Sequence, residues 1–150
     1  MTIENVKFET HLYSREEIEA VIKFGVKVEG RLTRPFICTF DWNGKRWRFE
    51  LPVEYAATPS IPRWLRSIKP ATGAVRWISY FHDFGYEFHS MTRADLDDLM
   101  VAGMKAGGDG WRTRQLVWGS IRTGGWRAWS KHEGEVTLKG LTLIYENADE

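Results

Sequence analysis

The sequence predicts an α+β fold, with a small, mostly antiparallel sheet and about three helices packed on one side. Segments of alternating apolar and polar residues stand towards both ends of the chain, which is typical of half-buried strands. Three helix-length segments follow one another between about residues 72 and 121, separated by turn and glycine signals. A length of 150 residues suits one domain, so we expect 1–150 to form a single unit.

The N-terminal segment is expected to form a strand and then a short helix. Apolar and polar residues alternate from Val6 to Tyr13, the period-two pattern of a strand. Ser14 and Glu17 then form a capping box, and apolar residues at helical spacing follow as far as Gly25.

The segment from Phe36 to Leu51 predicts a β-hairpin. Asn43-Gly44 lies at its centre, and this dipeptide tolerates the positive φ angles of a two-residue turn. Counting outward from the turn pairs apolar residues on one face: Phe36 with Leu51, Cys38 with Phe49 and Phe40 with Trp47. The other face carries the polar pairs: Thr39 with Arg48 and Asp41 with Arg46. One face should therefore be buried, with Cys38 acting there as a small hydrophobic residue.

Three helices and a final strand are predicted after the hairpin. The helices should run from about Thr72 to Phe84, from Arg93 to about Lys105, and from about Trp111 to Ile121. The second helix follows a Thr92-x-x-Asp95 cap, and a glycine-rich break at residues 107–110 separates it from the third. Alternation returns from Glu135 to Tyr145, so this segment should close the sheet.

The composition indicates a hydrophobic core, and the net charge gives no overall attraction to nucleic acids or anionic membranes. Hydrophobic residues make up 43% of the chain, there are eight tryptophans, and the net charge is +1. These values argue against disorder and against a broad basic surface. The single Cys38 excludes an internal disulfide and is compatible with a reducing cytosol. The polar N-terminus does not resemble a signal peptide and no apolar run is long enough for a membrane span, so we expect a soluble protein.

Five residues are candidates for a catalytic site: Ser60, His82, Asp83, Arg93 and Asp97. His82 and Asp83 are helical neighbours that point about 100° apart, so both cannot face one ligand squarely. The pattern favours a core histidine, whereas a functional role requires a carboxylate or metal from another element, for which Asp97 is the candidate. One histidine with scattered carboxylates has too few ligands for a transition metal, so we expect no metal and no other cofactor.

The spacing of Arg93 and Asp97 predicts an ion pair at i and i+4 on the second long helix. Asp97 also shares its helical face with apolar residues, and a buried carboxylate needs a partner, for which Arg93, His82 and Ser60 are available. Ser60 lies in a rigid Ser-Ile-Pro corner and is better suited to capping a helix than to nucleophilic attack. We predict that His82, Arg93 and Asp97 form one structural network beneath the Ser60–Pro62 corner.

Arginines and tryptophans interleave in the C-terminal third of the chain, a pattern that can stack bases and neutralise phosphates. The candidate binding residues are Arg112, Arg114, Arg122, Trp126 and Arg127. However, Trp111 and Trp118 share one helical face with Gln115, as packing anchors do, which favours a structural role for them.

Three motifs resemble those of a family of phage and prophage proteins known as domain of unknown function 1353. They are Ser60-Ile61-Pro62-Arg63, His82-Asp83-x-x-Tyr86, and Arg93 with Asp97, where Leu96 replaces the family's alanine. Met104, Gly125-Trp126 and Trp129 also fall where similar proteins have a methionine and a glycine-aromatic segment, so the resemblance covers Pro52 to Trp129. The chain departs from the family at Ala56 and Ala57, where a threonine and an aspartate are expected. If that aspartate belongs to a site, this chain lacks it.

The family's name carries no activity, and the resemblance implies a phage-type accessory protein that contacts another phage or host protein, in the host cytoplasm or the virion. The alternative is a small hydrolase built on the five catalytic candidates. The second alternative is nucleic-acid binding through the basic C-terminal third. An open cleft joining the five residues would favour the hydrolase, and a dry buried network would favour the interaction protein.

Overall fold

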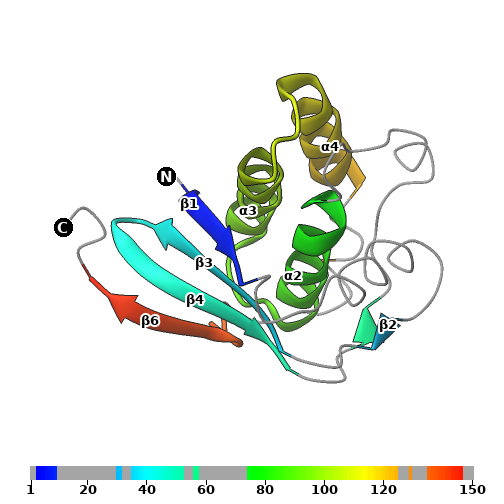
Figure 1. Cartoon of the computed structure of the whole chain (residues 1–150). Helices are drawn as coiled ribbons and strands as arrows, with labels where there is room; N and C mark the ends of the chain where they lie inside the picture. The colour runs from blue at the N-terminus through cyan, green and yellow to red at the C-terminus, as the bar shows by residue number, and fades with distance from the viewer. Residues whose placement is uncertain are drawn as a thin grey trace.

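The computed structural model describes residues 3–9, 30–31, 35–52, 56–57, 74–124, 129 and 135–146. Within them a four-stranded antiparallel sheet of order β1-β3-β4-β6 has three helices packed against it, which confirms the predicted α+β fold (Figure 1). The strands are β1 (Ile3–Phe8), β3 (Phe36–Trp42), β4 (Lys45–Leu51) and β6 (Leu141–Tyr145). The helices are α2 (Ala74–Phe88), α3 (Arg93–Ala106) and α4 (Trp111–Gly124). A separate two-stranded sheet pairs β2 (Gly30–Arg31) with β5 (Ala56–Ala57).

The β3–β4 hairpin has the register that the sequence predicts. Asn43 and Gly44 form the turn with φ angles of 52° and 75°, and Phe40 lies opposite Trp47. Phe40 is fully buried and Trp47 packs partly buried against the core, so the apolar face is the inner one. Cys38 is also fully buried there, and burial raises the pKa of its thiol well above the ordinary value.

Polar side chains hold the outer face of the sheet together. Arg46 forms an ion pair with Asp41 at 2.8 Å and donates to Thr39 Oγ1 and to the Asn5 carbonyl, each at 2.9 Å. Asn5 lies in a bulge of β1 with a φ angle of 53°, and the extra residue lets Ile3 and Val6 both face the core. Beyond the bulge, Val6 and Phe8 alternate with the exposed Lys7 as expected, and residues 10–13 of the predicted strand lie outside the described part of the chain.

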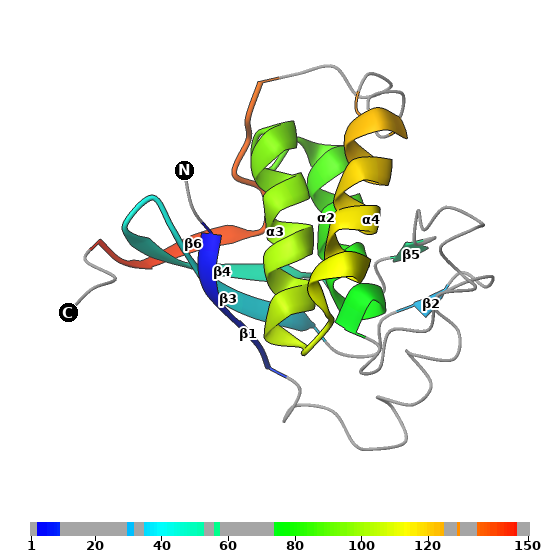
Figure 2. The same ribbon diagram turned by 90° about the horizontal axis from the view of Figure 1, so that it is seen from above.

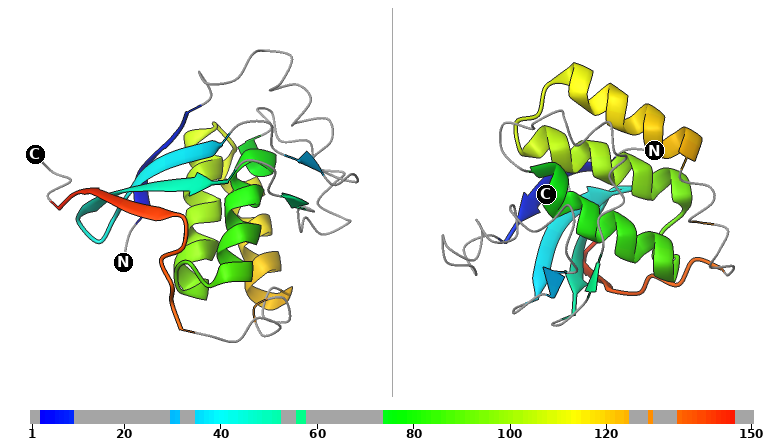
Figure 3. Two further views of the ribbon diagram at one scale, coloured as in Figure 1. Left: turned by 90° about the horizontal axis from the view of Figure 1, so that it is seen from below. Right: turned by 90° about the vertical axis from the view of Figure 1, so that its right-hand side faces the viewer.

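The helices form a layer on the inner face of the sheet (Figure 2). Aromatic rings join α2 to the hairpin: Phe81 lies 5.3 Å and Phe84 5.9 Å from Phe49 between ring centroids. α3 lies between α2 and α4 and also contacts β1, so it is the central helix of the layer (Figure 3). A glycine permits the close approach of α2 and α3, since a Cβ at Gly85 would lie 2.2 Å from a methyl of Leu96.

Several boundaries differ from the predicted ones. α2 continues past the expected end at Phe84 to Phe88, because Gly85 serves helix packing instead of ending the helix. α3 begins as predicted, with Thr92 accepting a hydrogen bond from the Asp95 amide at 3.2 Å. The final strand covers only Leu141–Tyr145, and the expectation that it begins at Glu135 is wrong. Residues 135–138 are exposed and outside any strand.

Three predicted features lie outside the described residues: the short helix after Ser14, the Ser60–Pro62 corner, and the Gly125-Trp126 segment with Arg127. Within the described part of the chain, no helix has both the length and the apolar character needed to cross a membrane.

Candidate functional site

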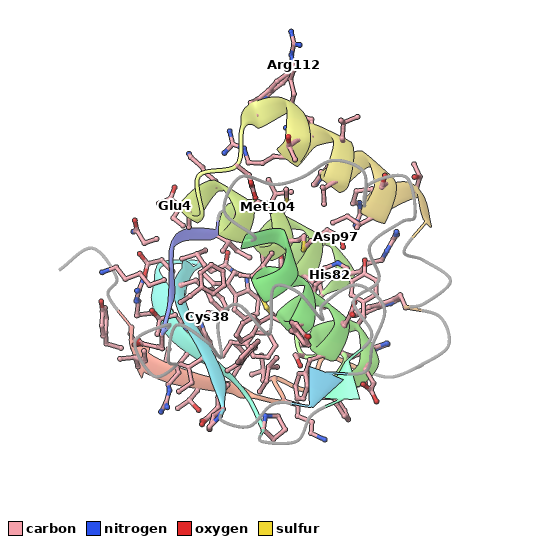
Figure 4. The ribbon with its side chains drawn as sticks, turned by 45° about the vertical axis from the view of Figure 1, so that its right-hand side comes forward. Glu4, Cys38, His82, Asp97, Met104 and Arg112 are labelled. Carbon is pink, nitrogen blue, oxygen red and sulfur yellow. The ribbon has the colours of Figure 1, made fainter. Side chains whose placement is uncertain are left out.

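The buried carboxylate of Asp97 is the centre of a polar cluster between the helices. His82 and Tyr86 lie one turn apart on α2. His82 points across to Asp97 on α3 (Figure 4), and Tyr86 contacts the same carboxylate. His82 Nε2 lies 2.8 Å and the Tyr86 hydroxyl 2.5 Å from Asp97 Oδ1. Arg122 on α4 donates from Nη1 to Asp97 Oδ2 at 2.9 Å. Both carboxylate oxygens are thus occupied by donors from the two neighbouring helices.

Arg93 joins this cluster through Tyr86 instead of Asp97. Its Nε donates to the Tyr86 hydroxyl at 3.3 Å, and its Nη2 donates to the carbonyls of Ile121 at 3.0 Å and Arg122 at 2.6 Å. These carbonyls belong to the last turn of α4, where a cation is favoured by the helix dipole. The predicted Arg93–Asp97 ion pair is therefore wrong, because Arg93 binds the carbonyls of the last turn of α4 instead.

Charges around His82 and Asp97 stabilise their ionised forms. Burial alone would lower the pKa of His82, but carboxylates face both ring nitrogens, Asp97 at 2.8 Å and Asp83 at 4.0 Å. Their combined effect raises the pKa of His82 above its ordinary value of 6.5. Burial would raise the pKa of Asp97, but hydrogen bonds from His82, Tyr86 and Arg122 hold it below its ordinary value. Burial, together with the Asp97 carboxylate, raises the pKa of Tyr86.

This geometry has the features of a structural network. Asp97 is fully buried, and His82 and Tyr86 are 6% and 5% exposed, so the group that a substrate would have to reach lies inside the molecule. A general base must lie within hydrogen-bond reach of its substrate, whereas the carboxylate of Asp97 is fully buried between the helices. The network predicted for His82 and Asp97 is confirmed, with Arg93 attached indirectly.

The remaining catalytic candidates are not brought to Asp97. Asp83 lies beside the other nitrogen of His82, at 4.0 Å, which is an ion-pair distance and too long for a hydrogen bond. Ser60 lies outside the described residues, so its relation to the cluster stays a prediction. Among the described residues, no group of three or more histidine, cysteine, aspartate or glutamate side chains is arranged to hold a metal ion.

Two members of the cluster were missed as partners of Asp97. Tyr86 stands four residues after His82, so helical spacing alone could have placed both side chains on one face. Arg122 was assigned only to nucleic-acid binding, and its pairing with Asp97 depends on the packing of α4 against α3, which no local pattern reveals.

The predicted nucleic-acid candidates are spread over different environments. Arg112 is exposed and projects from the outer end of α4 (Figure 4). Arg114 is partly buried beside Asp109, and Arg122 is bound to Asp97. Trp126 and Arg127 lie outside the described residues. The described arginines therefore do not form one continuous basic stripe.

The expectation that Trp111 and Trp118 are packing anchors is wrong, because they are 66% and 41% exposed. The buried side of α4 consists instead of Val117 and Ile121, which face α3. α4 lies at the outside of the helix layer, so only one narrow stripe of it is covered by the described elements (Figure 2). The two tryptophans thus present aromatic surface to solvent.

A second exposed apolar region lies on β6, at one edge of the sheet. Leu143, Ile144 and Tyr145 are 38%, 48% and 45% exposed. Leu143 pairs with Trp47 and Tyr145 with Arg46, so one extra residue, Ile144, lies in a bulge between these pairs. No other described element lies beyond β6 (Figure 1).

No family model, curated protein or solved structure matches this chain. The resemblance to the phage family therefore stays a prediction.

Proposed function

We propose that this protein is an interaction protein that binds an extended segment of a partner protein at the β6 edge of its sheet. The observation that supports the proposal is the exposure of three successive apolar side chains, Leu143, Ile144 and Tyr145, on an edge strand. An edge strand offers main-chain donors and acceptors to an incoming strand, and side chains beside it supply specificity.

The two edge strands of the sheet, β1 and β6, differ in how well they are protected from pairing with another strand. β1 carries the exposed charged residues Glu4 and Lys7, and charged side chains on an edge strand protect it from pairing. β6 carries no charged residue from Leu141 to Tyr145. Its short length and the bulge at Ile144 limit the pairing to a few residues, which suits a specific partner segment better than open-ended self-association.

The buried network weighs against the alternative of a hydrolase. His82 and Asp97 use their hydrogen-bonding capacity on one another and on neighbouring helices, and Arg93 is bound to helix carbonyls. A catalytic site in an unliganded protein keeps polar groups free in a concave pocket. Nucleic-acid binding is also less well supported, because Arg122 is engaged with Asp97 and Arg114 is partly buried.

The sequence resemblance alone supports three further parts of this proposal. They are a phage or prophage setting, a phage or host protein as partner, and a location in the host cytoplasm or the virion. The exposed β6 edge supports an added strand as the kind of contact. Any partner found should therefore supply a segment with alternating apolar residues.

A library of displayed random peptides, selected against the purified protein, tests the proposal. Selected peptides should be rich in β-branched and aromatic residues, and on binding they should slow hydrogen exchange of the β6 amides. Ile144→Lys should weaken their binding about tenfold or more, because a charge at the edge opposes pairing. Leu116→Lys is a matched control on α4, since Leu116 is 46% exposed. Failure to enrich any peptide, or equal loss in both variants, would contradict the proposal.

A further inference from the structure

A groove of about 500 Å³ lies between α3, α4 and the start of β1. Its volume is within the range of small-molecule sites, roughly 300–1,000 Å³. It stands next to β1, which is at the opposite edge of the sheet from β6 (Figure 3). The groove is therefore separate from the proposed docking edge, while Asp98 in its lining lies near the charges of Asp97 and Arg122.

The lining combines an apolar floor with polar groups of opposite charge. Ile3 and Val101 supply apolar surface, while Asp98, Lys105 and Gln115 supply a carboxylate, an ammonium and an amide. The charges of Asp98 and Lys105 cancel, so the lining favours neither a strongly anionic nor a strongly cationic ligand. Between them the three polar groups offer both donors and acceptors, which is what a ligand with many hydroxyl groups needs.

Trp118 forms the aromatic wall of this groove. Trp118 lies beside Asp98 in the lining, and two-fifths of the residue stays exposed. A carboxylate has several acceptor sites, so Asp98 can accept hydrogen bonds from ligand hydroxyls. Burial, with the nearby charges of Asp95 and Asp97, raises the pKa of Asp98. A flat apolar ring next to hydrogen-bonding side chains matches a pyranose sugar, which has an apolar C–H face and a polar rim.

A second exposed tryptophan lies on the same side of α4. Trp111 is seven residues, about two helical turns, before Trp118, so their Cα atoms are about 10.5 Å apart along the helix axis. α3 and α4 run antiparallel side by side, and Trp118 lines the groove together with Asp98 and Lys105 of α3 (Figure 2). This rise is close to the length of two linked pyranose units in an extended chain.

We propose that the groove and the adjoining face of α4 bind an uncharged, extended oligosaccharide of the β-1,4-linked kind, with one sugar stacked on Trp118 in the groove and another, two units along, on Trp111 outside the groove lining. Asp98, Gln115 and Lys105 bind the hydroxyl or amide groups of the sugars that lie in the groove. A curved α-linked chain does not keep alternate sugars in line along a straight helix, so it fits the two tryptophans poorly.

Calorimetric titration of the full-length protein with chitotetraose, cellotetraose and maltotetraose tests this proposal. At least one of the two β-1,4-linked tetrasaccharides should bind saturably, and maltotetraose should bind at least about tenfold more weakly. Binding of chitotetraose alone would assign recognition to the N-acetyl groups, and binding of cellotetraose alone to the hydroxyls. No saturation by either up to about 10 mM, or equal binding of maltotetraose, would overturn the proposal.

Variants separate the two stacking positions. Trp118→Ala should weaken both the di- and the tetrasaccharide at least about tenfold, and Trp118→Phe should recover much of the loss because it keeps a ring. Trp111→Ala should weaken the tetrasaccharide and leave the disaccharide unchanged. Leu116→Ala, on another side of α4 and 46% exposed, is the control that should change neither. An equal effect of Leu116→Ala and Trp118→Ala would overturn the assignment of the groove.

Discussion

Asp97 shows how a single buried charge is held in this protein. Its carboxylate is fully buried and accepts hydrogen bonds from His82 and Tyr86 on α2 and from Arg122 on α4. A buried charge is tolerated only when its partners replace the hydration that it has lost. Because Asp97 is fully buried, an external ligand cannot reach its carboxylate in this structure.

Replacing Asp97 with alanine should lower the free energy of unfolding by about 3 kcal/mol, because His82, Tyr86 and Arg122 all lose their common acceptor. Urea unfolding followed by circular dichroism measures the change. Glu135→Ala removes an exposed carboxylate and should leave the unfolding midpoint unchanged. A midpoint for Asp97→Ala that equals that of the parent would show that the network does not stabilise the fold.

At the scale of elements, α2 and α3 are joined by shape as well as by polar contacts. Gly85 of α2 lies against Leu96, and Gly103 of α3 lies against Ile78, so each helix offers a glycine to a large side chain of the other. Leu96 and Ile78 are fully buried. Neither side chain has solvent-exposed space into which it can move, so a larger residue at either glycine must strain the core.

Gly85→Ala should therefore destabilise the protein by about 1–2 kcal/mol, the strain of overpacking exceeding the roughly 1 kcal/mol that alanine gains in helix propensity. Gly119→Ala is the matched substitution, because Gly119 lies inside α4 with no other atom within 4 Å of the added methyl. It should raise stability by up to about 1 kcal/mol. Thermal unfolding of both variants measures the contrast, and a stabilised Gly85→Ala would mean that the two helices are less tightly packed than described.

For the whole molecule, the network makes stability depend on pH in a defined direction. The folded protein raises the pKa of His82 above 6.5, so the stability from its protonated form is fully present below pH 6.5. That contribution is lost as the pH rises through the raised pKa. The folded protein lowers the pKa of Asp97 below 3.8, so its contribution is present above pH 3.8 and is lost as the pH falls through the lowered pKa.

The network should thus contribute most between about pH 4 and pH 6.5. Urea unfolding across pH 4–9 should show the parent losing stability above about pH 6.5, whereas His82→Asn should lack this loss. The free energy of unfolding of His82→Asn is subtracted from that of the parent at each pH. This subtraction removes the contributions of Asp41, Asp98 and Asp109, whose pKa values are also shifted. If the difference in free energy of unfolding between the parent and His82→Asn does not vary with pH, His82 stays neutral in the folded protein.

Local patterns in the sequence determined the features that depend on neighbouring residues. Asn43-Gly44 sets the register of the hairpin because turn geometry and side-chain alternation act over a few residues. Thr92 caps α3 for the same reason, since its partner is three residues away. The contact of His82 with Asp97 could also be predicted from the sequence, because a short connection makes α2 and α3 neighbours.

The tertiary structure decided which groups meet across the helix layer and which stay exposed. Arg93 was expected to pair with Asp97 and instead binds the end of α4, and Arg122 takes its place at Asp97. Trp111 and Trp118 have the spacing of buried anchors, yet α4 lies at the outside of the layer and buries a different stripe. A helical pattern fixes which residues share a face, whereas the arrangement of the other elements decides which face is covered.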